Sequence, residues 1–99
     1  MLYAIVCEDR ADSTSKRLAA RPAHLERLHE LVRAGQLVLA GPHPAIDSAD
    51  PGPAGFTGSL IIAEFESMLV AREWAEADPF FICGVYANVV VKPFVQVLP

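Results

Sequence analysis

Apolar residues are distributed along the chain in two patterns, short continuous runs and longer stretches at helical spacing. The continuous runs end at charged residues, glycine or proline, and they predict strands at residues 2–7, 37–40, 59–65 and 85–97. The stretches at helical spacing predict a first helix between Ser13 and Gly35 and a second helix from Ser67 to Asp78. The predicted order is strand, helix, strand, strand, helix, strand.

The first helix is predicted from its two ends and from its apolar face. Hydroxyl side chains at residues 13–15 can cap its start, and Ala34-Gly35 closes it where a left-handed glycine cap is usual. Pro22 lies inside the pattern, so it either belongs to the first turn of a restarted helix or kinks one continuous helix. The predicted buried face consists of Leu18, Leu25, Leu28, Leu31 and Val32.

Residues that terminate regular structure are concentrated between the second and third strands. Residues 41–58 contain four prolines and four glycines, and Gly41-Pro42 is expected to stop the second strand. Connections of this length in a compact domain are usually functional loops. The sequence therefore places a candidate binding loop between these two strands.

The C-terminal third of the chain carries two further prolines that restrict its structure. Asp78-Pro79 ends the second helix, because the residue before proline is pushed out of helical geometry. Residues 80–84 then form a short apolar connection. Lys92-Pro93 interrupts the last strand, which predicts a bulge or bend there and a place at a sheet edge or crossing point. The predicted inner face of the second helix consists of Met68, Ala71, Trp74 and Ala75.

This element order is that of the ferredoxin-like βαββαβ fold of the α+β class, an antiparallel four-stranded sheet with two helices on one face. A chain of 99 residues suits one such domain, spanning residues 1–99. The other sheet face would be left bare, and 53% hydrophobic residues with a mean hydropathy of +0.32 is rich for so small a domain. We therefore expect a homodimer, a dimeric α+β barrel in which two bare faces pack together.

Charge and cysteine content exclude several classes of partner. The net charge is −4 with a pI near 5.2, and no basic run is present, so nucleic-acid binding is not expected. No segment approaches the ~20 consecutive apolar residues of a membrane span, and the N-terminal run is too short for a signal peptide. Cys7 and Cys83 are too few for a disulfide scaffold or zinc site and are expected to be small buried residues. We expect a cytoplasmic protein with reduced thiols.

Two residues are the main candidates for chemistry. His24 lies roughly 20–40° from Leu28 and Leu31 on a helical wheel at ~100° per residue, which places it at the margin of the buried face. It is either a half-buried histidine bonded to backbone or a general acid or base, because histidine gains and loses a proton near neutral pH. Asp78 is either a turn residue before proline or the carboxylate that orients a histidine ring.

Other polar residues offer weaker signals. His43 stands at the mouth of the long loop, where it either faces solvent or contacts a ligand, and the Ser59 hydroxyl either reaches a pocket or caps a strand end. No three ligands stand at metal spacing, no glycine-rich phosphate loop follows a strand, and the Gly-x-Ser-x-Gly motif is absent. We expect no metal and no organic cofactor.

Several short motifs in a fixed order resemble the YciI-like (YCII-related) family of small dimeric α/β-barrel proteins over nearly the full length. The matching residues are Arg17-Leu18, His24-Leu25, Ala40-Gly41-Pro42, Gly55-Phe56-Thr57-Gly58-Ser59, Trp74-Ala75, Asp78-Pro79-Phe80, Gly84-Val85-Tyr86 and Val91-Lys92-Pro93-Phe94. Each motif is weak by itself, and their order makes the match specific. Pro22 is a departure from what we expect in mid-helix, because a shift of the helix axis there would change the orientation of the His24 side chain.

The resemblance implies a ferredoxin-like dimer whose pocket holds a catalytic dyad of His24 and Asp78. It also implies that Ser59 and the Gly41-Pro42 turn are pocket neighbours, with His43 and Phe80 as further candidates for substrate binding. One branch of this family looks like a dehydrochlorinase that acts on a chlorinated hydroxyquinol.

Three functions are compatible with these observations. The first is a cofactor-independent lyase or hydrolase that uses His24 and Asp78 on a small cyclic or aromatic organic molecule. The second is a non-catalytic dimer that binds or senses a small metabolite in the same pocket. The third is an accessory domain whose dimer surface is its only purpose, which predicts no enclosed cavity.

Overall fold

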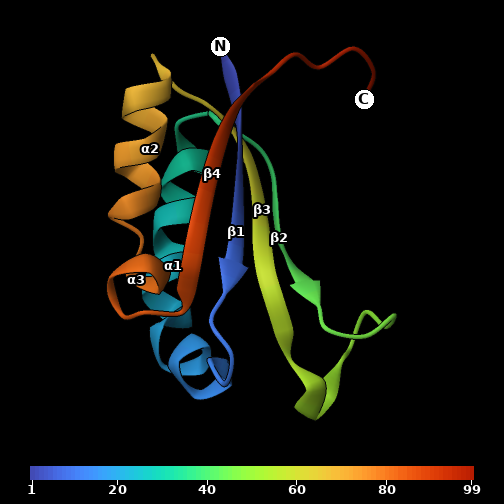
Figure 1. Ribbon diagram of the computed structural model, residues 1–99. Helices are drawn as coiled ribbons and strands as arrows, with labels where there is room; N and C mark the ends of the chain where they lie inside the picture. Colours follow the sequence, from blue (N-terminus) through green and yellow to red (C-terminus); the bar gives the residue numbers. More distant parts are fainter.

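The computed structural model describes residues 1–99 and shows one antiparallel four-stranded sheet with its α-helices on the same face (Figure 1). The strand order is β2-β3-β1-β4. This is the predicted ferredoxin-like α+β fold. The elements are β1 (Leu2–Asp9), α1 (Thr14–Arg33), β2 (Leu37–Pro44), the short 3-10 helix η1 (Gly52–Ala54), β3 (Phe56–Glu64), α2 (Met68–Glu76), α3 (Pro79–Ile82) and β4 (Tyr86–Phe94).

Strand β1 occupies the centre of the sheet, as its continuous apolar run predicts. Its alternate residues Tyr3, Ile5 and Cys7 are buried beneath the helices. Ile5 lies between Ile61 of β3 and Val91 of β4 in the register of the sheet, so three strands contribute to one core layer. One buried hydrophobic cluster joins the sheet to the helices. None of the helices combines the length and the apolar character that crossing a membrane requires.

Helix α1 runs without a break through Pro22, so the restarted helix is not observed. Its C-terminal end is closed as predicted, because Gly35 has a φ of 72° and the amides of Gly35 and Gln36 donate to the carbonyls of Val32 and Leu31. The hydroxyl capping of its start is wrong. Ser13 precedes the helix, but its Oγ donates to the Arg10 carbonyl at 2.6 Å and not to the helix amides.

The buried face of α1 differs from the predicted one. Leu18 and Val32 are exposed, whereas His24, Leu28 and Leu31 are buried. His24 therefore lies in the buried stripe and not at its margin. The prediction counted only apolar residues, but a polar side chain that has a hydrogen-bond partner can also be buried.

Strand β2 corrects the prediction that Gly41-Pro42 stops it. The strand continues to Pro44, and Pro42 pairs with Ser59 of β3. Proline is tolerated because β2 is an edge strand, where one side of the backbone needs no hydrogen-bond partner. The connection to β3 is therefore shorter than predicted and spans residues 45–55.

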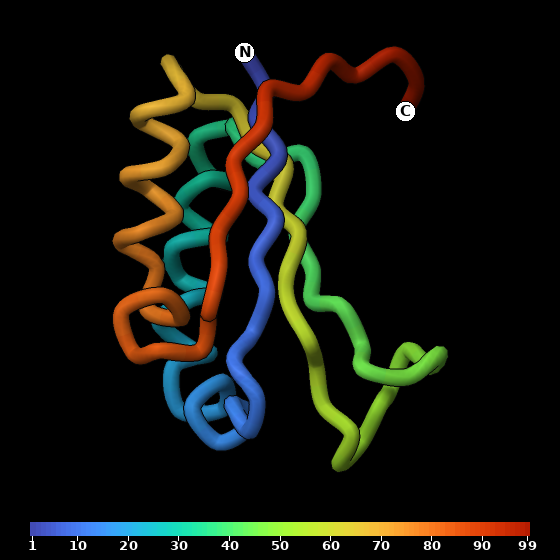
Figure 2. The backbone as a smooth tube through the Cα atoms, viewed as in Figure 1, coloured from blue at the N-terminus to red at the C-terminus, as the bar shows by residue number.

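The C-terminal third confirms some of the predictions and corrects others. Ser67 caps α2 by accepting from the Val70 amide at 3.1 Å. Ala71 and Ala75 are buried, but Met68 is exposed. Residues 80–84 are not a plain connection, because α3 begins at Pro79 and is followed by the exposed Cys83. Strand β4 is an edge strand, and Pro93 pairs with Tyr3 without a bulge, the register shift lying between Glu8 and Asp9. The predicted strand to residue 97 is too long, since β4 ends at Phe94 and residues 95–99 extend away from the sheet (Figure 2).

The sheet face opposite the helices carries no element of this chain (Figure 1). Alternation along the strands directs small and branched apolar side chains onto this open face. Leu39 is 45% exposed at its edge. The open face contains Ala4 and Val6 of β1, Leu39 of β2, Leu60 and Ile62 of β3, and Val90 of β4.

Candidate functional site

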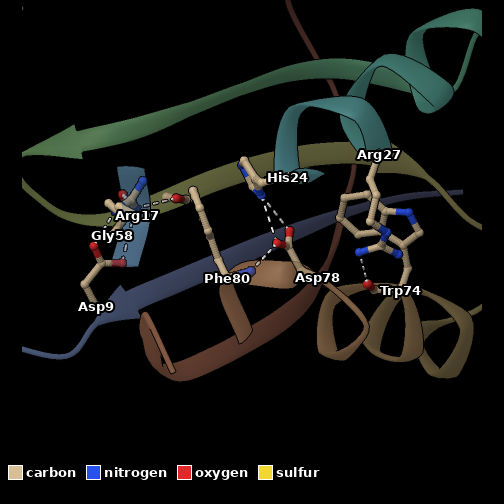
Figure 3. A network of polar contacts seen from close by, with 9 residues as sticks. Asp9, Arg17, His24, Arg27, Gly58, Trp74, Asp78 and Phe80 are labelled. Carbon is tan, nitrogen blue, oxygen red and sulfur yellow. Dashed lines mark hydrogen bonds and ion pairs between the residues drawn. The ribbon is translucent and has the colours of Figure 1, made fainter. Parts of the chain in front are cut away.

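His24 and Asp78, which lie 54 residues apart in sequence, are joined in the interior (Figure 3). His24 Nδ1 lies 2.9 Å from each carboxylate oxygen of Asp78, and the two residues are only 7% and 1% exposed. A carboxylate can only accept hydrogen bonds, so Nδ1 carries the hydrogen and donates it. Nε2 is then the ring nitrogen left for a ligand, because it makes no hydrogen bond within the chain.

Asp78 is held in place by the short helix that follows it. Its backbone is extended before Pro79, and its Oδ1 accepts a hydrogen bond from the Phe80 amide at 2.8 Å as the N-cap of α3. Asp78 therefore both terminates the turn before α3 and bonds to the His24 ring. The same carboxylate thus holds both the start of α3 and the ring of His24.

Phe80 fixes the plane of the histidine ring. The two rings stack with their centroids 4.0 Å apart and an angle of 11° between their planes. The Tyr86 ring contacts Phe80 edge-on, with the two ring centroids 5.6 Å apart. With one nitrogen bonded to Asp78 and one face covered by Phe80, the imidazole has a single well-supported orientation.

A cavity of about 190 Å³ opens beside this ring, between α1 and the edge of the sheet formed by β2 and β3. Its walls are apolar except for the ring of His24, one hydroxyl and two guanidinium groups. The cavity lining includes Arg17, Arg21, His24, Pro42, Ser59 and Phe80. An adjoining pocket of about 410 Å³ shares Arg17, Arg21, Pro42 and Phe80 with it and reaches toward η1.

Arg17 is a second polar group at the cavity, and its side chain is 11% exposed. Its guanidinium pairs with Asp9, with Nε 2.6 Å from Oδ2, and its Nη2 donates to the Gly58 carbonyl and to Ser59 Oγ, both at 2.9 Å (Figure 3). The same group lies over the Phe80 ring, 4.8 Å from its centroid. Arg17 thereby connects the ends of β1 and β3 to the ring that supports His24.

Sequence reasoning named Arg17 only as part of a family motif and did not mention the role of Asp9. A signal was present, because Arg17 is seven residues before His24 and so lies on the same face of the helix. The sequence contains no indication that Asp9 and Ser59 would be its partners, because they come from separate strands.

The structure brings most of the predicted site residues together. Ser59, Gly41, Pro42 and Phe80 all line the cavity beside His24. His43 does not, because β2 remains a strand at this point and successive side chains point to opposite faces. It lines a separate surface pocket with Glu8 and Thr57.

Two buried groups behind the cavity are held in their neutral forms. Burial raises the pKa of the Cys7 thiol to about 12, with a smaller contribution from the charge of Asp78. Burial also raises the pKa of Tyr86, whose hydroxyl is buried without a hydrogen-bond partner. Cys7 therefore confirms the prediction of a small buried residue, whereas the exposed Cys83 contradicts it.

Arg27 forms a third polar contact farther along α1. Its guanidinium lies over the Trp74 ring, 4.4 Å from the centroid, and donates to the Trp74 carbonyl at 2.9 Å (Figure 3). Burial lowers the pKa of Arg27. This contact clamps α2 against α1 and so positions the turn that carries Asp78. No group of three or more His, Cys, Asp and Glu side chains converges in a way that would hold a metal ion.

Comparison with known proteins shows the family and the fold of this chain. Residues 1–95 match the family described as the YCII-related domain. The chain belongs to this family. It is 60% identical over 97 residues to a protein named YciI from Escherichia coli O6:H1, a match that covers 98% of this chain and 99% of that protein. It is also 50% identical over 97 residues to an uncharacterized protein from Haemophilus influenzae, with the same coverage.

A solved structure has the same fold as this YCII-related chain. It is 5-chloro-2-hydroxyhydroquinone dehydrochlorinase (TftG) from Burkholderia phenoliruptrix AC1100, in complex with 2,5-dihydroxybenzoquinone. The TM-score is 0.84 at 29% identity, and the match covers 97% of this chain and 95% of that one. The family resemblance stated from the sequence motifs is thereby confirmed, and the fold is one that carries a dehydrochlorinase elsewhere.

Proposed function

We propose that this YCII-related protein is a cofactor-independent lyase or hydrolase that acts on a small cyclic or aromatic organic molecule. The observation that supports this most directly is the buried His24–Asp78 pair. Nδ1 of His24 is bonded to Asp78, Nε2 has no partner within the chain, and His24 lines a cavity. A histidine oriented by a carboxylate is a standard general base. The fold shared with a dehydrochlorinase supports the same reaction class.

The proposed reaction needs only proton transfer by this chain's residues. In an elimination, Nε2 of His24 takes a proton from the substrate, the freed electron pair forms a new double bond, and the leaving group departs with its bonding electrons. The imidazolium that results is stabilised by the Asp78 carboxylate through Nδ1–H. In a hydrolysis, Nε2 takes the proton from a water molecule instead. The proton is later released to the leaving group or to solvent.

The other cavity residues have roles in holding the substrate. The Phe80 ring and Pro42 provide apolar walls suited to a flat ring, and the Ser59 hydroxyl provides a polar contact opposite. Ser59 Oγ already accepts from Arg17, so its hydroxyl hydrogen is available to donate to a substrate oxygen. Gly41 contributes only backbone to the lining of the cavity.

Replacing His24 with asparagine tests the proposal with little change in structure. Asparagine places an amide N–H near the position of Nδ1, so the bond to Asp78 can persist while Nε2 is lost. Chloride release from 5-chloro-2-hydroxyhydroquinone, and from a panel of halogenated hydroxylated rings, should fall about 10²–10⁴-fold. His29→Asn is the matched control, because His29 lies exposed on the same helix. A His24→Asn variant that retains full turnover would refute the catalytic role.

The same experiment separates the second function, a non-catalytic dimer that binds a small metabolite. A wild-type protein that binds ring compounds in the cavity, shown by amide chemical shifts of Ser59 and Phe80, and turns none of them over would favour that function. The cavity beside His24 favours either of these two functions over the third, a domain that serves only as a dimer surface.

We propose further that a second copy of the chain covers the open sheet face. Most of this face is apolar, with Lys92 beside Ala4 as a charged residue on it, and the C-terminal segment beyond it exposes Val95, Val97 and Leu98. Leu39→Lys on the open face should convert a dimer to a monomer in analytical ultracentrifugation, because it buries an unpaired charge. Leu69→Lys on the exposed side of α2 is the control and should leave the assembly unchanged. A wild-type monomer, or a Leu39→Lys dimer, would contradict this proposal.

The cytoplasm is the proposed location. Both cysteines are unbonded, with Cys7 buried in the sheet and Cys83 exposed after α3. A reducing compartment keeps such thiols free. Fractionation of cells that produce the protein should recover it with cytoplasmic markers, and recovery from a secreted fraction would contradict the assignment.

A further inference from the structure

Arg21 differs from the other basic side chains of the cavity because it has no partner within the chain. Arg17 is paired with Asp9, and the His24 ring is paired with Asp78. Arg21 makes no hydrogen bond or ion pair, yet it lines both the cavity beside His24 and the adjoining pocket. Neither of these two pockets has an acidic residue in its lining. Arg21 is exposed, and it therefore contributes an unpaired, solvent-accessible positive charge to the lining of the cavity.

Helical geometry places this charge close to the proposed base. Arg21 lies four residues after Arg17 and three residues before His24, spacings at which side chains are neighbours on one face of a helix. Both residues line the same cavity, so a small ring bound beside His24 lies in a pocket bordered by Arg21 and its guanidinium group. Such a group binds oxygen anions through a planar fork of N–H donors.

We propose that the cavity takes an organic anion, in which a carboxylate, phenolate or enolate is attached to a small ring, and that Arg21 binds the charged oxygen. The inference rests on the proposed function and narrows its substrate class from small cyclic molecules to anionic ones. Arg21 is then a specificity-determining residue. It orients the ring so that the atom losing a proton faces His24.

The charge preference can be measured with two probes of nearly the same shape, benzoate and benzamide. Titration calorimetry on the full chain should show that benzoate binds about fivefold more tightly, the scale of a partly exposed charge pair. Arg21→Gln should remove this preference and leave benzamide binding unchanged, and Arg21→Lys should restore part of it. Arg33→Gln is the matched control, because Arg33 lies on the same helix in an exposed pair with Glu26.

Three outcomes would overturn the inference: equal binding of the two probes to the wild type, a preference that survives in Arg21→Gln, or no binding of benzoate at all. None of them depends on turnover. Conversely, a lost preference in Arg21→Gln together with full turnover in His24→Asn would uphold the anion site and refute the catalytic dyad. The two proposals can therefore fail separately.

Discussion

Substitution of Asp78 by asparagine isolates the contribution of its charge. The asparagine carbonyl oxygen can still accept from the Phe80 amide, so the cap of α3 survives. Its NH₂ group, however, faces the Nδ1–H of His24, and two donors cannot bond to each other. The hydrogen of the ring should therefore move to Nε2, which leaves Nδ1 as the acceptor and removes the lone pair from the cavity side.

The expected loss of stability follows from the bonds that each variant removes. A hydrogen bond to a charged group contributes about 1.5–3 kcal/mol and a neutral one about 1 kcal/mol, so Asp78→Asn should cost about 1–2 kcal/mol. Asp78→Ala loses the whole bond to His24 and also the helix cap, which contributes about 1 kcal/mol, and should cost roughly 3–4 kcal/mol. Solvent screening does not reduce these values, because the side chains of His24 and Asp78 are 8% and 1% exposed.

Urea unfolding followed by the fluorescence of Trp74, the single tryptophan, gives these free energies by linear extrapolation. A double-mutant cycle with His24→Ala and Asp78→Ala, which removes the whole bond, should show a coupling of about 1.5–3 kcal/mol. The nitrogen chemical shifts of the His24 ring should report a hydrogen on Nδ1 in the wild type and on Nε2 in Asp78→Asn. Asp50→Asn in the exposed loop is the control and should change the unfolding free energy by less than about 0.5 kcal/mol.

The reasoning would be refuted by a coupling below about 0.5 kcal/mol, which is the usual additivity error for sites that do not interact. Ring nitrogen shifts that are the same in the wild type and in Asp78→Asn would refute it as well. In that case Asp78 would be a helix cap only, and the hydrogen on the His24 ring would be set by another group.

Three further predictions concern the strands behind the cavity. Gly58→Ala should lower the free energy of unfolding by roughly 2 kcal/mol or more in urea, because a Cβ there collides with the Cys7 carbonyl. Gly41→Ala is the control and should cost much less, because a Cβ there meets no other atom. Equal losses in the two variants would contradict the packing. Tyr86→Phe should raise the unfolding free energy by about 1 kcal/mol, because it removes a buried hydroxyl without a partner, and a clear loss would show that the hydroxyl is bonded. The raised pKa of Cys7 makes its contribution to stability complete below about pH 9 and lost as the pH rises toward 12, at about 1.4 kcal/mol per pH unit. Cys7→Ala should therefore show a weaker decline in unfolding free energy over this range than the wild type, and parallel curves would refute the shift.

The sequence by itself determined the features that depend on neighbouring residues. Strand and helix order follows from local periodicity, and the ends of helices follow from residues such as Gly35 and Ser67, whose bonds are to backbone within a few positions. His24 and Asp78 were named as candidates from their residue types and from family motifs. That they meet could not be read from their spacing of 54 residues.

The tertiary structure decided the features that depend on sheet order and on burial of polar groups. Strand β2 continues through Pro42 only because the fold makes it an edge strand, and this continuation turns His43 away from the cavity. His24 and Arg17 occupy the inner side of α1 because Asp78, Asp9 and Ser59 reach them from other elements. An apolar pattern cannot report such partners, because burial of a polar side chain depends on bonds that form only once the chain has folded.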